Sequence, residues 1–231
     1  MKINRDLYEN NVKAENQVKI NQHFLGKNLE DPYKVMFIGN SITYHETKND
    51  IGWPYRHGMA ASKPQKDYVH LLRKMISKKV RKPVSCLVYN ASDFERDFLN
   101  HVPREKLEKQ AKKFNPNLII VRLGENLCSK PFKTDDLERE FLKLVKNLKK
   151  ITNDIQITSL WWGREDFDNT IKTVAKKEKI VFSYIGFLGE KNENKAINKF
   201  KHQGVQKHPG DLGMKRLADI LFNDLNKYKL I

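Results

Sequence analysis

Cysteine is scarce in this chain of 231 residues, which contains two. Cys86 and Cys128 show no metal or redox spacing, and each lies in or just after an apolar run, where a free cysteine behaves as a small hydrophobic side chain. Long apolar runs are also lacking. No window approaches the ~18 apolar residues of a membrane span, and the first twenty residues contain no apolar signal-peptide core. We therefore expect a cytoplasmic protein with reduced thiols and no membrane partner.

Acidic residues are few relative to basic ones: 28 Asp and Glu stand against 44 Lys and Arg, a formal net charge of +16. Such a field attracts anionic substrates or polymers. The lysine pairs do not form one motif, and they fall near the C-terminal ends of predicted helices, where cations complement the helix dipole. A solvated basic surface is thus favoured over nucleic-acid binding. The pairs are Lys78-Lys79, Lys112-Lys113, Lys149-Lys150 and Lys176-Lys177.

Apolar runs that suit strands alternate with segments whose apolar residues recur every three or four positions, as in amphipathic helices. No abrupt change of composition divides the chain. The alternation predicts one α/β domain, a parallel sheet with helices on both faces. The expected strands are 34–38, 84–89, 118–123, 155–161 and 180–184, and the expected helices are 68–76, 104–114, 134–148, 170–177 and 212–228.

Residues 1–30 are polar, rich in Asn and Lys, and only weakly periodic. We interpret them as an extension that packs over the domain or stays partly mobile, with the domain itself at 31–231.

The first predicted strand runs straight into Gly39-Asn40-Ser41, within KVMFIGNSITYH (34–45). A glycine lets the backbone turn sharply, and the N–H groups that follow can receive negative charge. Ser41 is therefore either a helix N-cap or a nucleophile. On local sequence alone the cap is favoured, because serine is common there and needs no chemistry to explain it.

Polar residues at the ends of the other strands change this preference. In a parallel sheet the ligand crevice lies beyond the carboxyl ends of the strands. Asn126 follows the third strand, and His208 stands just before the last helix. Histidine can take a proton from a serine hydroxyl, and an oxyanion needs preorganised donors such as the Ser41 N–H and the Asn126 amide. Asn126 bonding its own loop and His208 as a helix-start residue remain the simpler alternatives.

Three motifs carry a family resemblance. FIGNSIT, LGEN and HPGDLGM, in this order and spacing, resemble blocks I, III and V of the SGNH (GDSL-like) hydrolases, in particular the bacterial branch that reads GNSIT. The resemblance covers roughly 34–225. It implies a flavodoxin-like three-layer α/β/α sandwich with a five-stranded parallel sheet. It also implies ester hydrolysis, often of acetyl groups on carbohydrates, without metal or cofactor.

The motifs imply a role for each matching position. Ser41 is the expected nucleophile and an oxyanion donor through its own N–H. Gly124 and Asn126 match the block III pattern, with the Asn126 side chain as a second donor. His208 is the expected base.

The chain departs from the family pattern at two places. Val205 stands where an acid usually precedes the histidine by three residues. His208 is then oriented either by a backbone carbonyl or by an acid from elsewhere, with Asp211 and Glu125 as candidates. The block II glycine also has no clear counterpart, so the N–H of Ala91 or Ser92 is the candidate for that oxyanion donor.

Several residues near the predicted rim are candidates for substrate contact. Trp162 and Trp53 offer aromatic faces that suit a sugar ring, although tryptophans are more often core or loop anchors. Arg122 and Arg164 could hold an anionic group. Asn90 follows the second strand, and the other histidines, including His45 and His57, are interpreted as surface or loop residues.

The sequence predicts a serine hydrolase that cleaves an O-acyl ester, in particular an O-acetyl ester, of a carbohydrate or small molecule. Two alternatives stay open. An O-acyltransferase would use the same residues, and a non-catalytic binding protein on this scaffold would explain the missing acid and glycine.

Overall fold

A six-stranded sheet forms the centre of the computed structural model, which describes residues 21–129 and 132–231. Its order is β1-β3-β2-β4-β5-β6. The five strands β2 to β6 are parallel, in the flavodoxin-like order that was predicted, and β1 adds an antiparallel edge beside β3. The bounds are Gln22–Leu25 (β1), Tyr33–Gly39 (β2), Val84–Asn90 (β3), Leu118–Val121 (β4), Ile155–Thr158 (β5) and Val181–Ser183 (β6).

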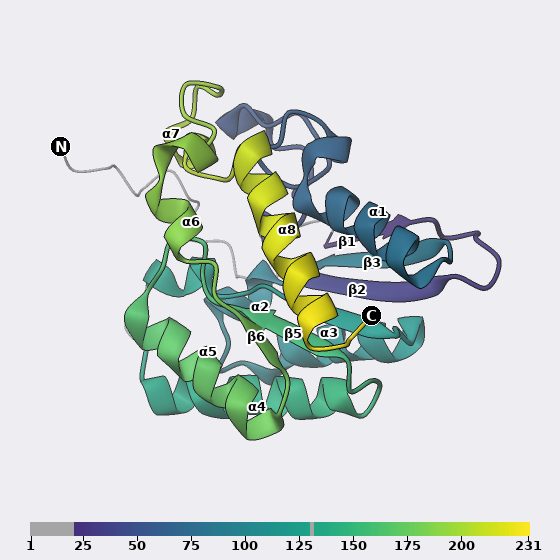
Figure 1. Ribbon diagram of the computed structural model, residues 1–231. Helices are drawn as coiled ribbons and strands as arrows, with labels where there is room; N and C mark the ends of the chain where they lie inside the picture. The colour runs from purple at the N-terminus through teal and green to yellow at the C-terminus, as the bar shows by residue number, and fades with distance from the viewer. Residues whose placement is uncertain (1–20, 130–131) are drawn as a thin grey trace.

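Helices cover both faces of the sheet, so the fold is a three-layer α/β/α sandwich (Figure 1). The first layer holds α1 (Tyr68–Val80) and α8 (Asp211–Lys227). The opposite layer holds α3 (His101–Phe114), α4 (Thr134–Lys149) and α5 (Glu165–Glu178). Short helices lie in the connections: α2 (Ser92–Arg96), α6 (Phe187–Glu190), α7 (Gln203–Gln206), η3 (Asn49–Ile51), η4 (Pro64–Lys66), η5 (Glu125–Ser129) and η6 (Asn192–Asn194).

Strand β2 is buried on both faces, which explains its continuous apolar sequence. Val35 and Phe37 pack toward α1 and α8, whereas Met36 and Ile38 pack toward the opposite layer. Side chains alternate between the faces of a strand, so one apolar run supplies both cores. The five expected helices are present; α1, α3, α4 and α5 are longer than expected, and α8 is shifted by one residue. Thr134 is the first residue of α4, and the helix has no side-chain capping hydrogen bond.

The predicted N-terminal extension needs a correction. Gln22–Leu25 pairs with β3, and Asn21 bonds both the Tyr89 hydroxyl and the Asn90 N–H, so these residues belong to the sheet. Residues 1–20 lie outside the described part of the chain. Cys86 is buried within β3, as predicted, and burial raises the pKa of its thiol to about 12. The side chain of Cys128 is outside what the structure describes.

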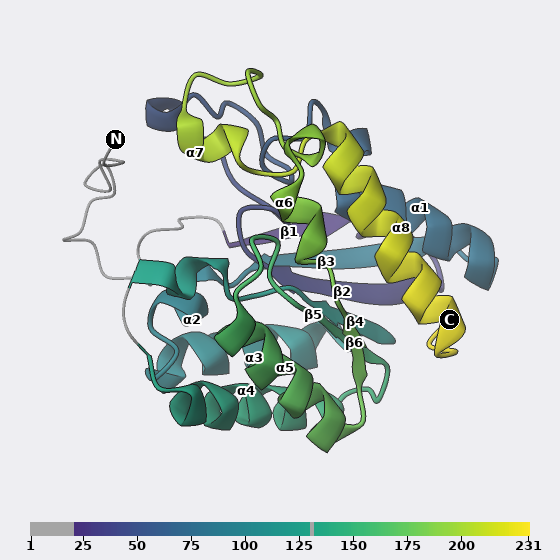
Figure 2. The ribbon, with the colours of Figure 1, turned by 60° about the vertical axis from the view of Figure 1, so that its left-hand side comes forward.

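The segments that follow the carboxyl ends of the parallel strands meet at one end of the molecule. There the loop after β2 and the segment that carries α7 lie side by side, as the two views agree (Figure 2). A small apolar cluster joins them, made of Trp53, Met59 and Ala60 from the loop with Ala196 and Val205 from the segment. Among the described residues, no helix has the length and apolar character needed to cross a membrane.

Candidate active site

Ser41 occupies a turn that follows β2 directly. The N–H groups of Thr43 and Tyr44 donate to the Asn40 carbonyl at 2.9 and 3.0 Å, and the Ile42 N–H donates to Asn40 Oδ1 at 3.2 Å. No helix begins at this turn, so a helix-cap role does not apply to Ser41. Within the described residues, the Ser41 N–H donates to no protein acceptor and is available for a ligand.

His208 lies against the Ser41 hydroxyl, with Nε2 2.9 Å from Oγ. On the other side of the ring, Nδ1 is 2.8 Å from the Gly204 carbonyl oxygen. A carbonyl oxygen only accepts hydrogen bonds, so Nδ1 carries the proton and Nε2 presents its lone pair to the serine hydroxyl. Trp162 packs edge-on against the imidazole, with ring centroids 5.3 Å apart. The structure thus holds His208 in the tautomer that a general base needs.

The environment of His208 favours the neutral ring. Removal from water lowers its pKa to about 4, only partly opposed by the Gly204 carbonyl, and the charges of His45 and Arg122 lower it further. Among the described residues, no carboxylate contacts Nδ1 to stabilise the imidazolium. The base is therefore unprotonated at neutral pH.

Neither acid proposed from the sequence orients His208. Asp211 accepts from the Ser62 N–H at 2.8 Å and from its hydroxyl at 2.7 Å. Glu125 accepts from the Trp161 N–H at 3.0 Å and lies in a buried network instead. Both candidates were wrong, and the alternative, a backbone carbonyl, is what the structure shows. Val205 itself is 1% exposed in the apolar cluster beside Trp53.

Gly124 and Asn126 follow β4 at the start of η5. Gly124 has φ +132°, and a Cβ there would lie 2.2 Å from Phe167 Cζ, so only glycine fits. The Asn126 amide donates to the Glu95 carboxylate, and its Oδ1 accepts from Arg96 at 3.3 Å. Within the part of the chain that the structure describes, only one hydrogen of Asn126 Nδ2 has a protein acceptor.

The candidate block II donors are both occupied. The Ala91 N–H donates to the Gly39 carbonyl at 2.6 Å, and the Ser92 N–H donates to Asn90 Oδ1 at 3.0 Å. Asn90 is 1% exposed and its amide donates to the Tyr44 carbonyl at 2.7 Å. These three residues therefore fix the backbone of the rim. Neither N–H is free for an oxyanion, and the Asn90 side chain is not free for substrate.

The two tryptophans proposed for substrate contact differ in their exposure. Trp53 is fully buried, and its ring lies 5.0 Å from His57 and 5.7 Å from Phe200 between centroids, so it anchors the loop and offers no face to substrate. Trp162 keeps part of its surface exposed beside His208. It remains the aromatic candidate at the rim.

The arginines expected at the rim have other partners. Arg122 is fully buried and ion-paired with Glu125. Arg164 forms two 2.8 Å bonds with Asp166, and its guanidinium stacks over Phe132 at 4.4 Å. Neither is placed to hold a substrate anion in the way that was predicted.

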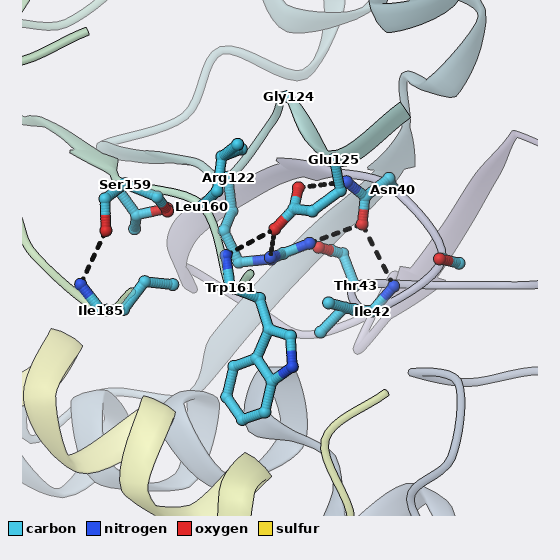
Figure 3. A network of polar contacts seen from close by, with 12 residues as sticks. Asn40, Ile42, Thr43, Arg122, Gly124, Glu125, Ser159, Leu160, Trp161 and Ile185 are labelled. Carbon is cyan, nitrogen blue, oxygen red and sulfur yellow. Dashed lines mark hydrogen bonds and ion pairs between the residues drawn. The ribbon is translucent and has the colours of Figure 1, made fainter. Parts of the chain in front are cut away.

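A buried polar network that the sequence did not reveal lies next to the turn that contains Asn40, Ile42 and Thr43 (Figure 3). In it, Asn40 Nδ2 donates to Glu125 Oε2 at 2.6 Å, and Arg122 contacts both Glu125 and Asn40 Oδ1. Glu95 completes the network from α2. One feature of the sequence could have pointed to this network. The segment Ser92–Arg96 has charged residues directly after the end of a strand, at the edge of the sheet where the candidate site lies. No periodicity marked which of them turns inward.

Solved structures with the same architecture include esterases and a lipase/acylhydrolase. An esterase, EstA from Pseudoalteromonas sp., aligns over 85% of this chain and 98% of its own, with TM-score 0.59 and 10% identity. The lipase/acylhydrolase from Enterococcus faecalis aligns over 84% and 96%, with TM-score 0.59 and 10% identity. A variant of Axe2, an acetyl xylan esterase from Geobacillus stearothermophilus, aligns over 84% and 94%, with TM-score 0.56 and 15% identity.

The chain has the same three-layer α/β/α fold as these esterases and the acylhydrolase. The likeness to these esterases and to the acylhydrolase, together with the strand order, confirms the architecture predicted from the three motifs. At identities of 10 to 15% the likeness establishes the fold. No family model and no curated protein sequence matches the chain. The chemistry of the site therefore follows from the chain's own side chains.

Proposed function

We propose that the protein is an esterase that forms an acyl-enzyme on Ser41. The observation that carries this proposal is the 2.9 Å contact between Ser41 Oγ and the unprotonated Nε2 of His208. A serine hydroxyl is a weak nucleophile until a base takes its proton, and here the base is in hydrogen-bond reach and in the right tautomer.

The reaction uses two half-steps. His208 Nε2 takes the Ser41 proton while Oγ attacks the ester carbonyl, and the oxyanion is held by the Ser41 N–H and the free Nδ2 hydrogen of Asn126. The tetrahedral intermediate expels the alcohol, which receives the proton from Nε2. Water then attacks the acyl-enzyme, again giving its proton to His208, and the carboxylic acid leaves as Ser41 regains its hydrogen.

The Gly204 carbonyl provides one of the two functions of the missing acid. In the serine-protease triad the acid fixes the tautomer and stabilises the imidazolium. A carbonyl oxygen also fixes the tautomer, but it carries only a partial charge, so the second contribution is smaller. We propose slower turnover than a complete triad would provide.

The substrate is proposed to be an O-acyl ester of a carbohydrate or similar small alcohol, with acetyl as the first acyl group to test. Trp162 beside His208 supplies an aromatic surface suited to a sugar ring. Arg96, which reaches Asn126 Oδ1, and the net charge of +16 support a substrate that carries an anionic group.

Ser41→Ala is expected to abolish hydrolysis of an aryl acetate while leaving the circular dichroism spectrum and the urea midpoint unchanged. Ser62→Ala, an exposed serine that bonds Asp211, is the matched control and should keep wild-type turnover. A fluorophosphonate probe should label one site per chain in wild type and none in Ser41→Ala. A folded wild-type protein that neither turns over acetate nor takes the label would instead be the non-catalytic binding protein.

A further inference from the structure

Glu95 is a fully buried carboxylate whose hydrogen bonds go to residues on both sides of the candidate active site. Its Oε1 accepts from the Gly124 N–H and from Asn40 Nδ2, and its Oε2 accepts from Asn126 Nδ2. Burying a carboxylate is unfavourable unless hydrogen bonds compensate for lost hydration. Here three N–H groups compensate in part, and burial together with the nearby Glu125 raises the pKa of Glu95 to about 7. These donors come from the segments that follow β2 and β4.

The side-chain amide of Asn126 is held from both ends by neighbouring residues of α2. Glu95 accepts from its Nδ2, and Arg96 donates to its Oδ1 at 3.3 Å. Rotating the amide by half a turn would place Oδ1 against a carboxylate and the NH2 group against a guanidinium. The two contacts therefore fix which end of the amide is which. One Nδ2 hydrogen is used by Glu95, and the other is left for the pocket.

Glu95 also connects Asn126 with the turn of Ser41. Asn40 Nδ2 donates to Glu95 at 2.8 Å, while Asn40 Oδ1 accepts the Ile42 N–H that shapes the turn. Figure 3 shows the Asn40 side chain between this turn and Glu125. One carboxylate is thus hydrogen-bonded both to Asn126 and to the residue that shapes the turn of Ser41. It links the positions of the Ser41 N–H and the Asn126 N–H, which lie 85 residues apart in sequence.

We propose that Glu95 is a positioning residue of the oxyanion hole, acting through Asn126, and this proposal rests on the esterase function proposed above. Its carboxylate directs the second Nδ2 hydrogen of Asn126 toward the developing oxyanion, and Arg96 keeps the amide from rotating. Oxyanion donors act because they are oriented before the reaction begins, so a freely rotating Asn126 would lose much of its effect.

Glu95→Gln tests this directly. Its amide oxygen is expected to face the two donors Gly124 and Asn40, which turns its NH2 group against the NH2 group of Asn126. Asn126 is then displaced, and kcat for a neutral aryl acetate should fall about tenfold or more, with KM changed less than about twofold. Removal of one oxyanion donor lowers kcat by about 10² to 10³, which sets the upper bound. Wild-type kcat in this variant would overturn the proposal.

A double-mutant cycle separates positioning from a general structural effect. Asn126→Ala removes the donor itself, and Glu95→Gln in that background should produce no further fall in kcat. An equal fall in both backgrounds would show that Glu95 acts independently of Asn126, contrary to the proposal. Glu140→Gln is the matched control: Glu140 is 5% exposed and ion-paired with Arg104 on α3, away from the site, so its kcat should stay unchanged.

Two measurements keep the proposal testable if Glu95→Gln folds poorly or if turnover is absent. Arg96→Met loosens the other end of the amide from a partly exposed position, and it should lower kcat in wild type but not in Asn126→Ala. The side-chain ¹⁵N–¹H resonances of Asn126 should shift in Glu95→Gln or Arg96→Met and stay in place in Glu140→Gln. Unshifted resonances would refute the positioning role, whereas shifted resonances in a protein without Ser41-dependent turnover would refute only the esterase function.

Discussion

Gly124 shows at the scale of one residue how the backbone positions the candidate site. Its φ of +132° lies where side chains are rarely tolerated, and Phe167 and Leu160 crowd the place of a Cβ. Its N–H donates to Glu95, and Asn126 follows two residues later. The glycine therefore lets the chain pass close to the core and brings both its own N–H and the Asn126 side chain to the Glu95 carboxylate.

Gly124→Ala is expected to destabilise the protein by about 3 kcal/mol, from backbone strain and from overpacking against two core side chains. It should also lower kcat, because Asn126 moves with the loop. Gly52→Ala is the control: its φ is +68° but nothing lies within 4 Å of the added Cβ, so a loss of about 1 kcal/mol and unchanged kcat are expected. Urea unfolding and aryl acetate kinetics measure both. Similar losses in the two variants would contradict the crowding argument.

At the scale of elements, the loop after β2 and the segment around α7 act as one unit. Trp53, Met59 and Ala60 from the loop pack with Val205 from α7. The carbonyl that orients His208 belongs to Gly204, the residue before Val205. The apolar cluster therefore holds the acceptor of His208 in place, and it occupies the position where the family pattern has its acid.

Val205→Asp is consequently expected to lower stability and turnover and not to restore a triad. A carboxyl group in this cluster has no partner, so stability should fall by about 3 kcal/mol or more, with a lower kcat as Gly204 shifts. Val205→Thr has nearly the same volume with one hydroxyl, and a smaller loss is expected. The urea midpoint and kcat of the three proteins provide the test. A higher kcat in Val205→Asp would mean that the acid reaches His208 Nδ1.

For the whole molecule, the low pKa of His208 links stability to pH. The folded protein binds this proton only near pH 4, whereas the unfolded chain binds it near 6.5. The unfolded state therefore holds more protons between these values, and the free energy of unfolding falls as pH decreases from 6.5 to 4. Titration of His208 lowers the free energy of unfolding by up to about 3 kcal/mol between pH 6.5 and pH 4.

His208→Gln removes that contribution. We expect its free energy of unfolding to decline less steeply than that of wild type between pH 6.5 and 4, measured by urea unfolding at several pH values. Burial also lowers the pKa of His23, His45 and His57, but these groups are present in both proteins and cancel in the difference. Parallel curves for the two proteins would show that His208 does not titrate as described.

The sequence by itself determined the layered architecture, the five parallel strands and the order in which the motifs reach one rim. These follow from local properties: apolar periodicity, strand length and the turn that glycine permits after β2. The contact between Ser41 and His208 could be predicted from the sequence, because each residue stands at the end of an element. The parallel topology places both of these ends on the same side of the sheet.

Only the tertiary structure decided what completes the site. The Gly204 carbonyl, the occupied N–H groups of Ala91 and Ser92, and the three donors to Glu95 are contacts whose direction depends on how loops pack. A glutamate in a polar segment is usually solvated, and nothing in its neighbours marks that it will be buried. The three N–H groups that bond its carboxylate come from distant motifs and meet only after the chain has folded. For that reason the role of Glu95 could not be predicted from the sequence.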